Sequence, residues 1–389
     1  MDEKQVMKAF GFAAPDLSGA EADGQELGLG KLQFDRSGYT EFESFVAAVA
    51  DLPSKPAGRK PSCKSLSVNG KVVQDKMSKY LATNAESSSA LKEALKSPRH
   101  YLIYKNEDLH QKDENHFTLG TFIHSAFLEP SKFGKVKVLP EAGRGSKEGL
   151  RTLIRYYWDL LGIAPDVFLG ELGLNELKEV LFDLEMAAEK QGYTFISKDN
   201  EQIVRILQSS YKTYGGGIIP RLIANGKTEV SMYGRDPGTG LKVKIRPDCI
   251  LFEEQFGANI ILSVKTTSAT SIDAFMRDAA KYRYELAEGM YLQVASEITG
   301  RRFTGTLMLV AQTVIPFQCA LLWLSAEDLE CGKYKYAQAI DVVRQCKETD
   351  SWPGFECYAE EGAFGIIQPR FPEWIKSELK PQYVPNYNG

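Results

Sequence analysis

The chain has 389 residues, a formal net charge of −4 and 25% charged residues, which are ordinary values for a globular protein. This balance does not suggest a protein that coats DNA, but it is compatible with a local basic groove. No apolar run is long enough to span a bilayer, and the start of the sequence lacks the pattern of a secretory signal. The six cysteines form no CxxC pair, which argues against a zinc or iron–sulfur site. We therefore expect a reduced, cytoplasmic protein.

Residues 1–75 differ from the rest of the chain, because they are rich in turn-forming residues and show weak apolar periodicity. One short helix is expected around Glu41–Ala50. We interpret this part as a partly ordered N-terminal extension of unknown function, followed by one domain over 76–389.

The spacing of apolar residues is helical over much of the next stretch. Ser87 is a typical N-cap for the first of these helices, and the second is expected to end before Pro130. The predicted helices cover about 87–95, 119–128, 148–161, 174–191 and 200–214.

The pattern then changes to the alternation of strands. Strands at 229–233 and 242–246 flank the turn sequence Asp236–Gly240, and Cys249–Phe252 is expected to continue the second of them. A long helix and a second group of strands follow. These later elements are expected at 259–266 (strand), 272–294 (helix), 306–312 and 318–324 (strands) and 326–347 (helix). The order predicts an α/β fold with a central mixed sheet flanked by helices.

Two short segments carry the chemistry: Arg246-Pro247-Asp248, at the end of one strand, and Val264-Lys265-Thr266-Thr267, within the next. Alternation places Lys265 on the same strand face as Ser263. A lysine on a core strand is costly unless it faces a cleft or an ion pair. An aspartate that holds a divalent cation, next to a lysine that steadies an attacking water, is typical of a site that cleaves phosphodiesters.

Further segments belong to the same series. In chain order they are the Ser87 helix, Leu119–His124, Leu128–Pro130, Lys281–Tyr284 and Trp352–Gly354. Together with the two segments above, this series resembles the PD-(D/E)xK nuclease superfamily, and more narrowly its RecE-type exonuclease (exodeoxyribonuclease VIII-like) branch. The resemblance covers roughly residues 80–375. It implies a restriction-endonuclease-like core at about 115–350.

The resemblance also implies roles for single residues. Asp248 would be the main ligand of Mg²⁺ or Mn²⁺, and the backbone carbonyl of Val264 a further ligand. His124 would bind the metal or orient a ligand, and Lys265 would be the catalytic lysine.

Four more residues are implied to line the DNA. Thr266 would contact backbone or phosphate, with a plain strand-end residue as the alternative. Arg283, Tyr284 and Tyr291 would lie on the helix that flanks the DNA groove. For the tyrosines the alternative is core packing.

The sequence departs from the family pattern at two positions. Ser263 stands where the family has Asp or Glu, and Ala287 where it usually has Gln. Serine is a weak ligand for Mg²⁺, so the acid has either moved to another element or been lost. The candidates for a moved acid on the following helix are Asp278, Glu285 and Glu288. Glu288 is the preferred one, because helical spacing places it on the face of Tyr284 and Tyr291; the alternative is a solvent-exposed helix glutamate without a role in the site.

The expected function is a Mg²⁺-dependent DNA exonuclease that acts on duplex ends in phage or prophage recombination. The resemblance implies a homo-oligomer in the cytoplasm of a bacterial host, with a single-strand annealing recombinase as a partner. One alternative is a catalytically impaired nuclease-fold protein that binds DNA or a protein. A weaker alternative is an endonuclease with a migrated acidic residue.

Overall fold

The computed structural model describes residues 38–50, 52–53, 60–106, 119–164, 168–360 and 362–369. These residues belong to one compact unit, Ser37–Gly389. Within them, no helix is long and apolar enough to cross a membrane. Most of the predicted N-terminal extension lies outside the described residues, and the boundary near residue 75 stays a prediction.

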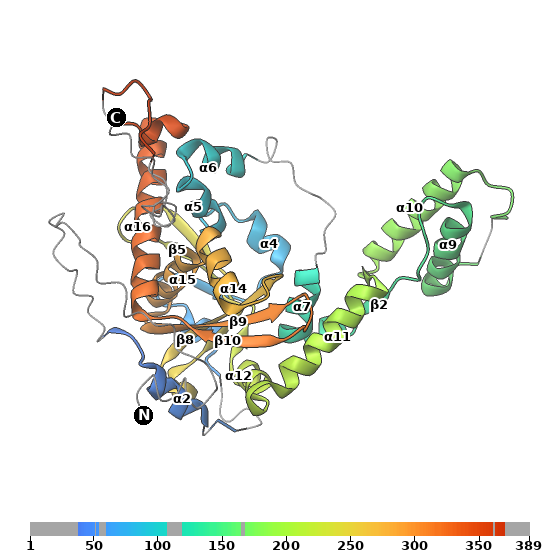
Figure 1. The fold of residues 1–389 in the computed structure, drawn as a ribbon, viewed down its shortest axis with the longest axis horizontal. Helices are drawn as coiled ribbons and strands as arrows, with labels where there is room; N and C mark the ends of the chain where they lie inside the picture. The colour runs from blue at the N-terminus through green and yellow to red at the C-terminus, as the bar shows by residue number, and fades with distance from the viewer. Residues whose placement is uncertain are drawn as a thin grey trace, which may run out of the picture. The chain divides into compact units, whose positions relative to one another are not determined.

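A five-stranded mixed sheet forms the centre of this unit, as predicted (Figure 1). In it β8 and β9 are parallel, and the other neighbouring pairs are antiparallel. The strands, in spatial order, are β10 (Cys319–Trp323), β9 (Phe303–Gln312), β8 (Asn259–Thr267), β7 (Cys249–Leu251) and β4 (Lys227–Thr228).

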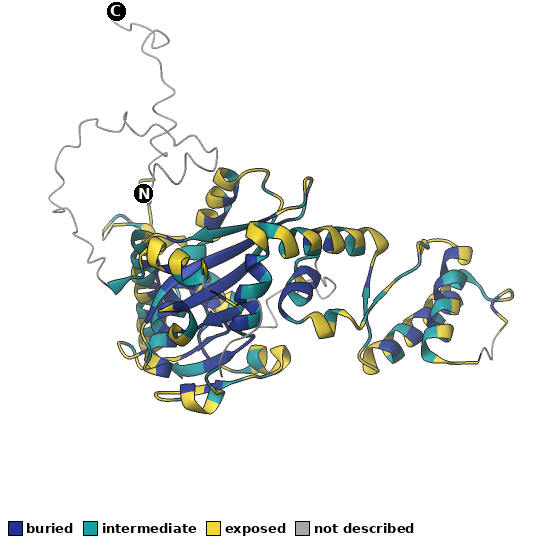
Figure 2. Ribbon diagram, turned by 90° about the horizontal axis from the view of Figure 1, so that it is seen from below, coloured by how far each residue is buried: buried dark blue, intermediate teal, exposed yellow. Residues whose placement is uncertain are grey.

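Both faces of the sheet are covered, so the central strands are buried between helices that are exposed on their outer sides (Figure 2). Ile261 on β8 belongs to the apolar cluster that includes α15 (Tyr284–Thr299) and α16 (Ala326–Thr349). Leu262 belongs to the cluster on the other face. That second cluster is built by α7 (Leu119–Leu128), α11 (Lys198–Thr213) and α12 (Ile218–Asn225). The predicted alternation along β8 is therefore confirmed.

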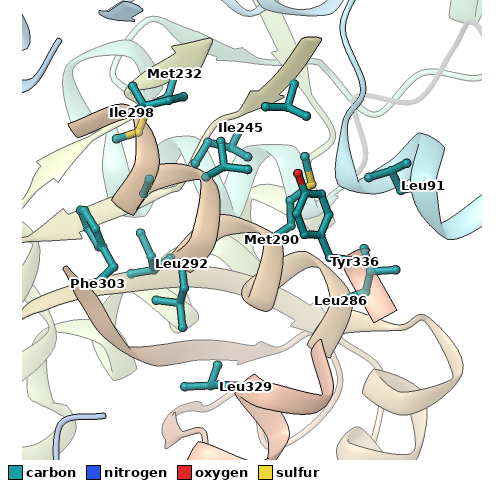
Figure 3. Close-up of a cluster of buried hydrophobic side chains, with 14 of the residues drawn as sticks. Leu91, Met232, Ile245, Leu286, Met290, Leu292, Ile298, Phe303, Leu329 and Tyr336 are labelled. Atoms are coloured by element: carbon teal, nitrogen blue, oxygen red, sulfur yellow. The ribbon is translucent and has the colours of Figure 1, made fainter. Parts of the chain in front are cut away.

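Helices α15 and α16 approach each other closely. A Cβ atom on Gly289 would lie 2.3 Å from the backbone of Gly332, so only glycine fits where they cross. Leu286 and Met290 on α15 and Tyr336 on α16 are fully buried near this crossing (Figure 3). The packing fixes α15, the helix that carries Glu288, against the sheet.

A second, three-stranded sheet has the order β1 (Lys71–Val73), β5 (Ser231–Arg235) and β6 (Lys242–Ile245). The predicted hairpin between β5 and β6 is confirmed. The prediction that Cys249–Phe252 continues the second strand is wrong, because β6 and β7 belong to different sheets. The strand breaks at Pro247, which has no N–H to donate to a ladder.

The predicted helix 272–294 is also wrong in one respect. Two helices, α14 (Ile272–Lys281) and α15, are separated at Tyr282 and Arg283, and Arg283 has a left-handed φ of 52°. Neither proline nor glycine marks this break in the sequence, so tertiary packing overrides the local helical pattern.

The other predicted helices are confirmed within a few residues. The helix expected at 41–50 is α2 (Phe42–Ala50), and its Phe45 stacks on Trp323 of β10 with ring centroids 4.7 Å apart. The remaining elements are α3 (Cys63–Leu66), α4 (Met77–Ala82), α5 (Ser88–Ala94), α6 (Pro98–Lys105), α8 (Pro130–Phe133), β2 (Val136–Val138), α9 (Lys147–Leu161), α10 (Leu174–Lys190), β3 (Thr194–Ile196), η2 (Tyr214–Gly216), α13 (Glu253–Phe256) and η3 (Phe355–Tyr358). Helices α9 and α10 pack together through an apolar cluster of their own.

Candidate active site

Asp248 is the centre of the candidate site. It lies between Pro247 and β7, and its two carboxylate oxygens have different partners. Oδ1 lies 2.8 Å from Nε2 of His124 on α7, and Oδ2 accepts the backbone N–H of Val264 on β8 at 2.6 Å. The structure therefore brings together the three distant segments that the sequence singled out, and it orients Asp248 from both sides.

Glu229 is a site residue that the sequence reasoning missed. Its Oε1 lies 3.5 Å from Nε2 of His124, and its Oε2 accepts a hydrogen bond from Nε of Arg246 at 2.8 Å. It has a left-handed φ of 58°, and its N–H donates to the carbonyl of Asp248. A non-glycine residue held in this conformation is a feature of functional sites. The sequence offered one signal, a carboxylate at the predicted edge of a strand whose partner carries Arg246.

His124, Glu229 and Asp248 form a group that could hold a metal ion, because one ligand atom from each lies within 4.8 Å of the others. Oε1 of Glu229 is buried and has no hydrogen-bond partner. Buried polar atoms are normally satisfied, so a carboxylate oxygen that accepts no hydrogen bond and lies beside another carboxylate fits a cation site. One imidazole and two carboxylates suit a divalent ion such as Mn²⁺ or Mg²⁺.

The charges in this group stabilise one another. Burial opposes the charged form of His124, but the hydrogen bond and charge of Asp248, with the charge of Glu229, raise the pKa of the imidazole. Burial also disfavours a charged Asp248, yet His124, Lys265 and the Val264 amide hold its pKa below the usual value. Burial raises the pKa of Glu229. The site therefore concentrates negative charge that a proton on His124 or a cation offsets.

Lys265, Glu288 and Ser263 form a second group. Nζ of Lys265 lies 3.1 Å from Oε1 of Glu288, and the Ser263 hydroxyl donates to Oε2 of Glu288 at 2.8 Å. The Glu288 side chain is 0% exposed. Burial opposes a charged lysine, but Glu288 and Asp248 raise the pKa of Lys265. Lys265 is thus a cation that is paired with Glu288 and further stabilised by the charge of Asp248.

Among the three candidates for a moved acid, Glu288 is the one that contacts Lys265 and Ser263. Glu285 instead pairs with Lys335 on α16 at 2.7 Å, and Asp278 lies on α14, beyond the break at Arg283. Glu288 is not a member of the metal-ligand group. Its position supports a role in holding Lys265, and its role as a metal ligand stays a prediction.

A cavity of about 750 Å³ opens beside the metal-ligand group. His124, Glu229, Asp248 and Tyr291 contribute to its lining, together with residues 80–85 and 87–90. The cavity is large enough for part of a nucleotide chain. Tyr291 therefore packs against the core and also lines the cavity beside the metal-ligand group.

The remaining predicted residues have less specific surroundings. The ring of Tyr284 lies beside Lys265, with 5.1 Å from its centroid to Nζ. Thr266 is partly exposed on β8, Arg283 precedes α15, and Ala287 is buried within α15. Val264 contacts Asp248 through its amide, and the role of its carbonyl stays a prediction.

A family model described as a PDDEXK-like domain of unknown function (DUF3799) matches residues 87–361. Among solved structures, a candidate exonuclease from Eubacterium rectale has 12% identity and a TM-score of 0.41, and the match covers 79% of this chain and 99% of that chain. A second structure, of the protein SSO0001, has 13% identity and a TM-score of 0.20, with 57% of this chain and 86% of that chain covered. No curated protein matches the sequence.

Proposed function

The chain belongs to the family of PDDEXK-like domains DUF3799, and from this premise we propose that it is a metal-dependent DNA nuclease. The observation that carries the proposal is the hydrogen bond from the Val264 amide to Asp248. It joins the metal-ligand group to the strand that presents Lys265. Cation site and lysine are then adjacent, as hydrolysis of a phosphodiester requires.

The residues have distinct tasks in this reaction. His124, Glu229 and Asp248 would hold the divalent ion, which supplies Lewis acidity toward the phosphate oxygens. Lys265 is kept charged by Glu288 and Asp248, so its ammonium can stabilise the charge that develops on the phosphorus oxygens. Ser263 and Glu288 fix the position of Lys265. Tyr284 and Tyr291 would bind the strand beside these groups, and Thr266 and Arg283 would contact it further along.

More specifically, we propose that the nuclease is an exonuclease that acts on duplex ends, as the resemblance to the RecE-type branch implies. A homo-oligomer and a single-strand annealing recombinase as partner rest on the same resemblance. Their test is the mass of the full-length protein in solution and its binding to a purified single-strand annealing recombinase.

The alternative is a nuclease-fold protein that binds DNA or another protein without cleaving it. The position of Glu288 favours this alternative. Its carboxylate contacts Lys265 and Ser263, and it lies outside the metal-ligand group. A site of this kind would hold its cation with fewer charges than two-metal nucleases use. An endonuclease with a migrated acid is the third possibility.

One experiment separates the three. Linear and circular duplex DNA are incubated with the full-length protein in Mg²⁺, in Mn²⁺ and in chelator, next to Asp248→Asn and Lys265→Met. Metal-dependent loss of linear DNA alone supports the exonuclease, and cleavage of circles supports the endonuclease. If no condition yields cleavage above that of the two variants, the enzyme proposal is wrong.

A further inference from the structure

A second lysine, Lys92, lies near Lys265 and has no role in the proposed reaction. Lys92 projects from α5, and its Nζ lies 5.1 Å from the ring centroid of Tyr284. Nζ of Lys265 lies at the same distance from that centroid. The two ammonium groups are therefore separated by at most twice 5.1 Å, and both lie near the ring of Tyr284.

Lys92 has no carboxylate of its own. Within the described part of the chain it makes neither an ion pair nor a hydrogen bond, and the ring of Tyr284 is its single charge-stabilising contact. The nearby acids form ion pairs with other lysines: Glu285 pairs with Lys335, and Glu288 pairs with Lys265. Burial and the charge of Lys265 lower the pKa of Lys92 to about 8, even though Glu288 and Glu285 act against the shift.

Helix α5, which carries Lys92, is firmly packed. Ser87 caps α5 by accepting the N–H of Ala90, and Leu91 is fully buried in the same cluster as α15 and α16. The lysine therefore cannot relieve its position by movement of the helix. A cation kept beside another cation is unfavourable for folding, and an anion that arrives between them would offset this.

We propose that Lys92 binds a backbone phosphate of the DNA strand, next to the one that Lys265 serves. This inference rests on the proposed nuclease function and deepens it. Lys265, held by Glu288, acts on the charge that develops during hydrolysis. Lys92, which forms no ion pair, binds charge that is already present in the ground state. Its loss should therefore raise KM and leave kcat within a few-fold.

Salt dependence gives a direct readout of this contact, since each neutralised phosphate adds about −0.9 to the slope of log K against log salt on duplex DNA. Binding of linear duplex to full-length protein is measured by fluorescence anisotropy between 50 and 300 mM salt. Asp248→Asn is the parent, so that no DNA is cut. Lys92→Met, Lys92→Arg and the control Lys96→Met are compared in this parent. Lys96 is a suitable control because it is exposed and already paired with Glu93.

Lys92→Met should make the slope shallower by about one unit and weaken binding about tenfold at low salt, and Lys92→Arg should restore most of both. Lys96→Met should change neither. An unchanged slope in a folded Lys92→Met overturns the inference, as does a fall in kcat with KM unchanged. If the wild type neither binds nor cuts DNA, this inference and the proposed function both fall. If it cuts DNA and Lys92→Met cuts it with the same KM, this inference alone falls.

Discussion

The hydroxyl of Ser263 donates a hydrogen bond to a carboxylate oxygen of Glu288 at 2.8 Å. The position at which the family resemblance leads one to expect an acid thus touches an acid that comes from α15 instead. The other oxygen of the same carboxylate lies 3.1 Å from Nζ of Lys265. Ser263 is therefore not an empty ligand position but a donor that orients the displaced carboxylate.

Replacing Ser263 by aspartate should harm the protein rather than improve it. Ser263→Asp would place a second carboxylate against Glu288, where both side chains are fully buried. The single charge of Lys265 can offset only one of two adjacent buried carboxylates, so keeping both ionised would be costly. We expect a loss of about 2–4 kcal/mol in unfolding free energy and at least a tenfold fall in nuclease activity.

Ser263→Ala is the matched control, since it removes the donor without adding charge. It should cost about 1 kcal/mol and retain most activity. A metal-dependent gain of activity in Ser263→Asp would instead show that the wild type lacks a ligand at this position, and that Glu288 has not replaced it. Thermal or urea unfolding and the linear-duplex assay measure the two effects.

The pairing of Lys265 with Glu288 predicts strong coupling between them. Lys265→Met leaves a fully buried carboxylate without its cation, so it should destabilise the fold by about 3–5 kcal/mol. Glu288→Gln should also destabilise it. In the double variant no charge is left unpaired, so much of the stability should return while activity stays absent.

A double-mutant cycle in urea measures the coupling free energy. If the two single effects simply add, the ion pair contributes nothing and the position of Glu288 has no energetic consequence for Lys265. Glu285→Gln on the same helix is the control, because its partner Lys335 lies outside the site.

Much of the site could be predicted because it depends on local pattern. The alternation along 259–266 fixed the side of the sheet on which Lys265 lies, and the order of the motifs tied His124 to Asp248. Glu229 could not be found in this way. Its role depends on a left-handed backbone conformation and on Arg246, and neither leaves a periodic signal in the sequence.

Glu288 is the candidate acid that contacts Lys265, but one assumption behind its prediction is wrong. The comparison of helix faces assumed one continuous helix, whereas the chain breaks at Arg283. Glu288 and Tyr284 lie on the same side of that break, so the relation between them survived. Asp278 lies on α14 and Glu285 on α15, so helical spacing does not relate the faces of these two residues. A break without proline or glycine is set by packing between distant elements, which a single sequence does not display.

The pH dependence of stability should reveal the His124–Asp248 pair in metal-free protein. The folded pKa of His124 is raised, so its contribution is fully present below the unfolded value of about 6.5 and is lost as pH rises through the folded pKa. The folded pKa of Asp248 is lowered, so its contribution is present above about 3.9 and is lost as pH falls through the folded pKa. Melting temperature should therefore decline on both sides of about pH 4–6.5, and Asp248→Asn should flatten the curve.

A bound divalent ion should raise the melting temperature at the higher pH values at which the metal-free protein loses stability. It requires a neutral imidazole, and the folded pKa of His124 is raised, so the stabilisation by Mn²⁺ should grow as pH rises through that folded pKa. At one hundred times Kd the expected gain is about 2.7 kcal/mol. Glu229→Gln and His124→Gln should each reduce it strongly. A gain that persists in Asp248→Asn would place the ion elsewhere.

Lys92 provides a final prediction in which stability and function move in opposite directions. Its folded pKa of about 8 lies below the usual value for lysine, so the folded state disfavours the proton that the unfolded state keeps. This penalty is fully present below about pH 8 and disappears above the unfolded pKa of about 10.4. Lys92→Met should therefore be more stable than the wild type at pH 7, on the order of 1 kcal/mol after allowance for solvent screening.

The gain should shrink as pH rises from about 8 to 10, because the wild type then loses the unfavourable charge. Lys96→Met, which removes an exposed and paired lysine, should show no such pH dependence. Urea unfolding at pH 7 and 9.5 measures the difference. A Lys92→Met protein that is less stable than the wild type at pH 7 would mean that Lys92 holds the fold together. If the charge of Lys92 serves to bind a phosphate, Lys92→Met should be more stable than the wild type and should bind DNA less tightly.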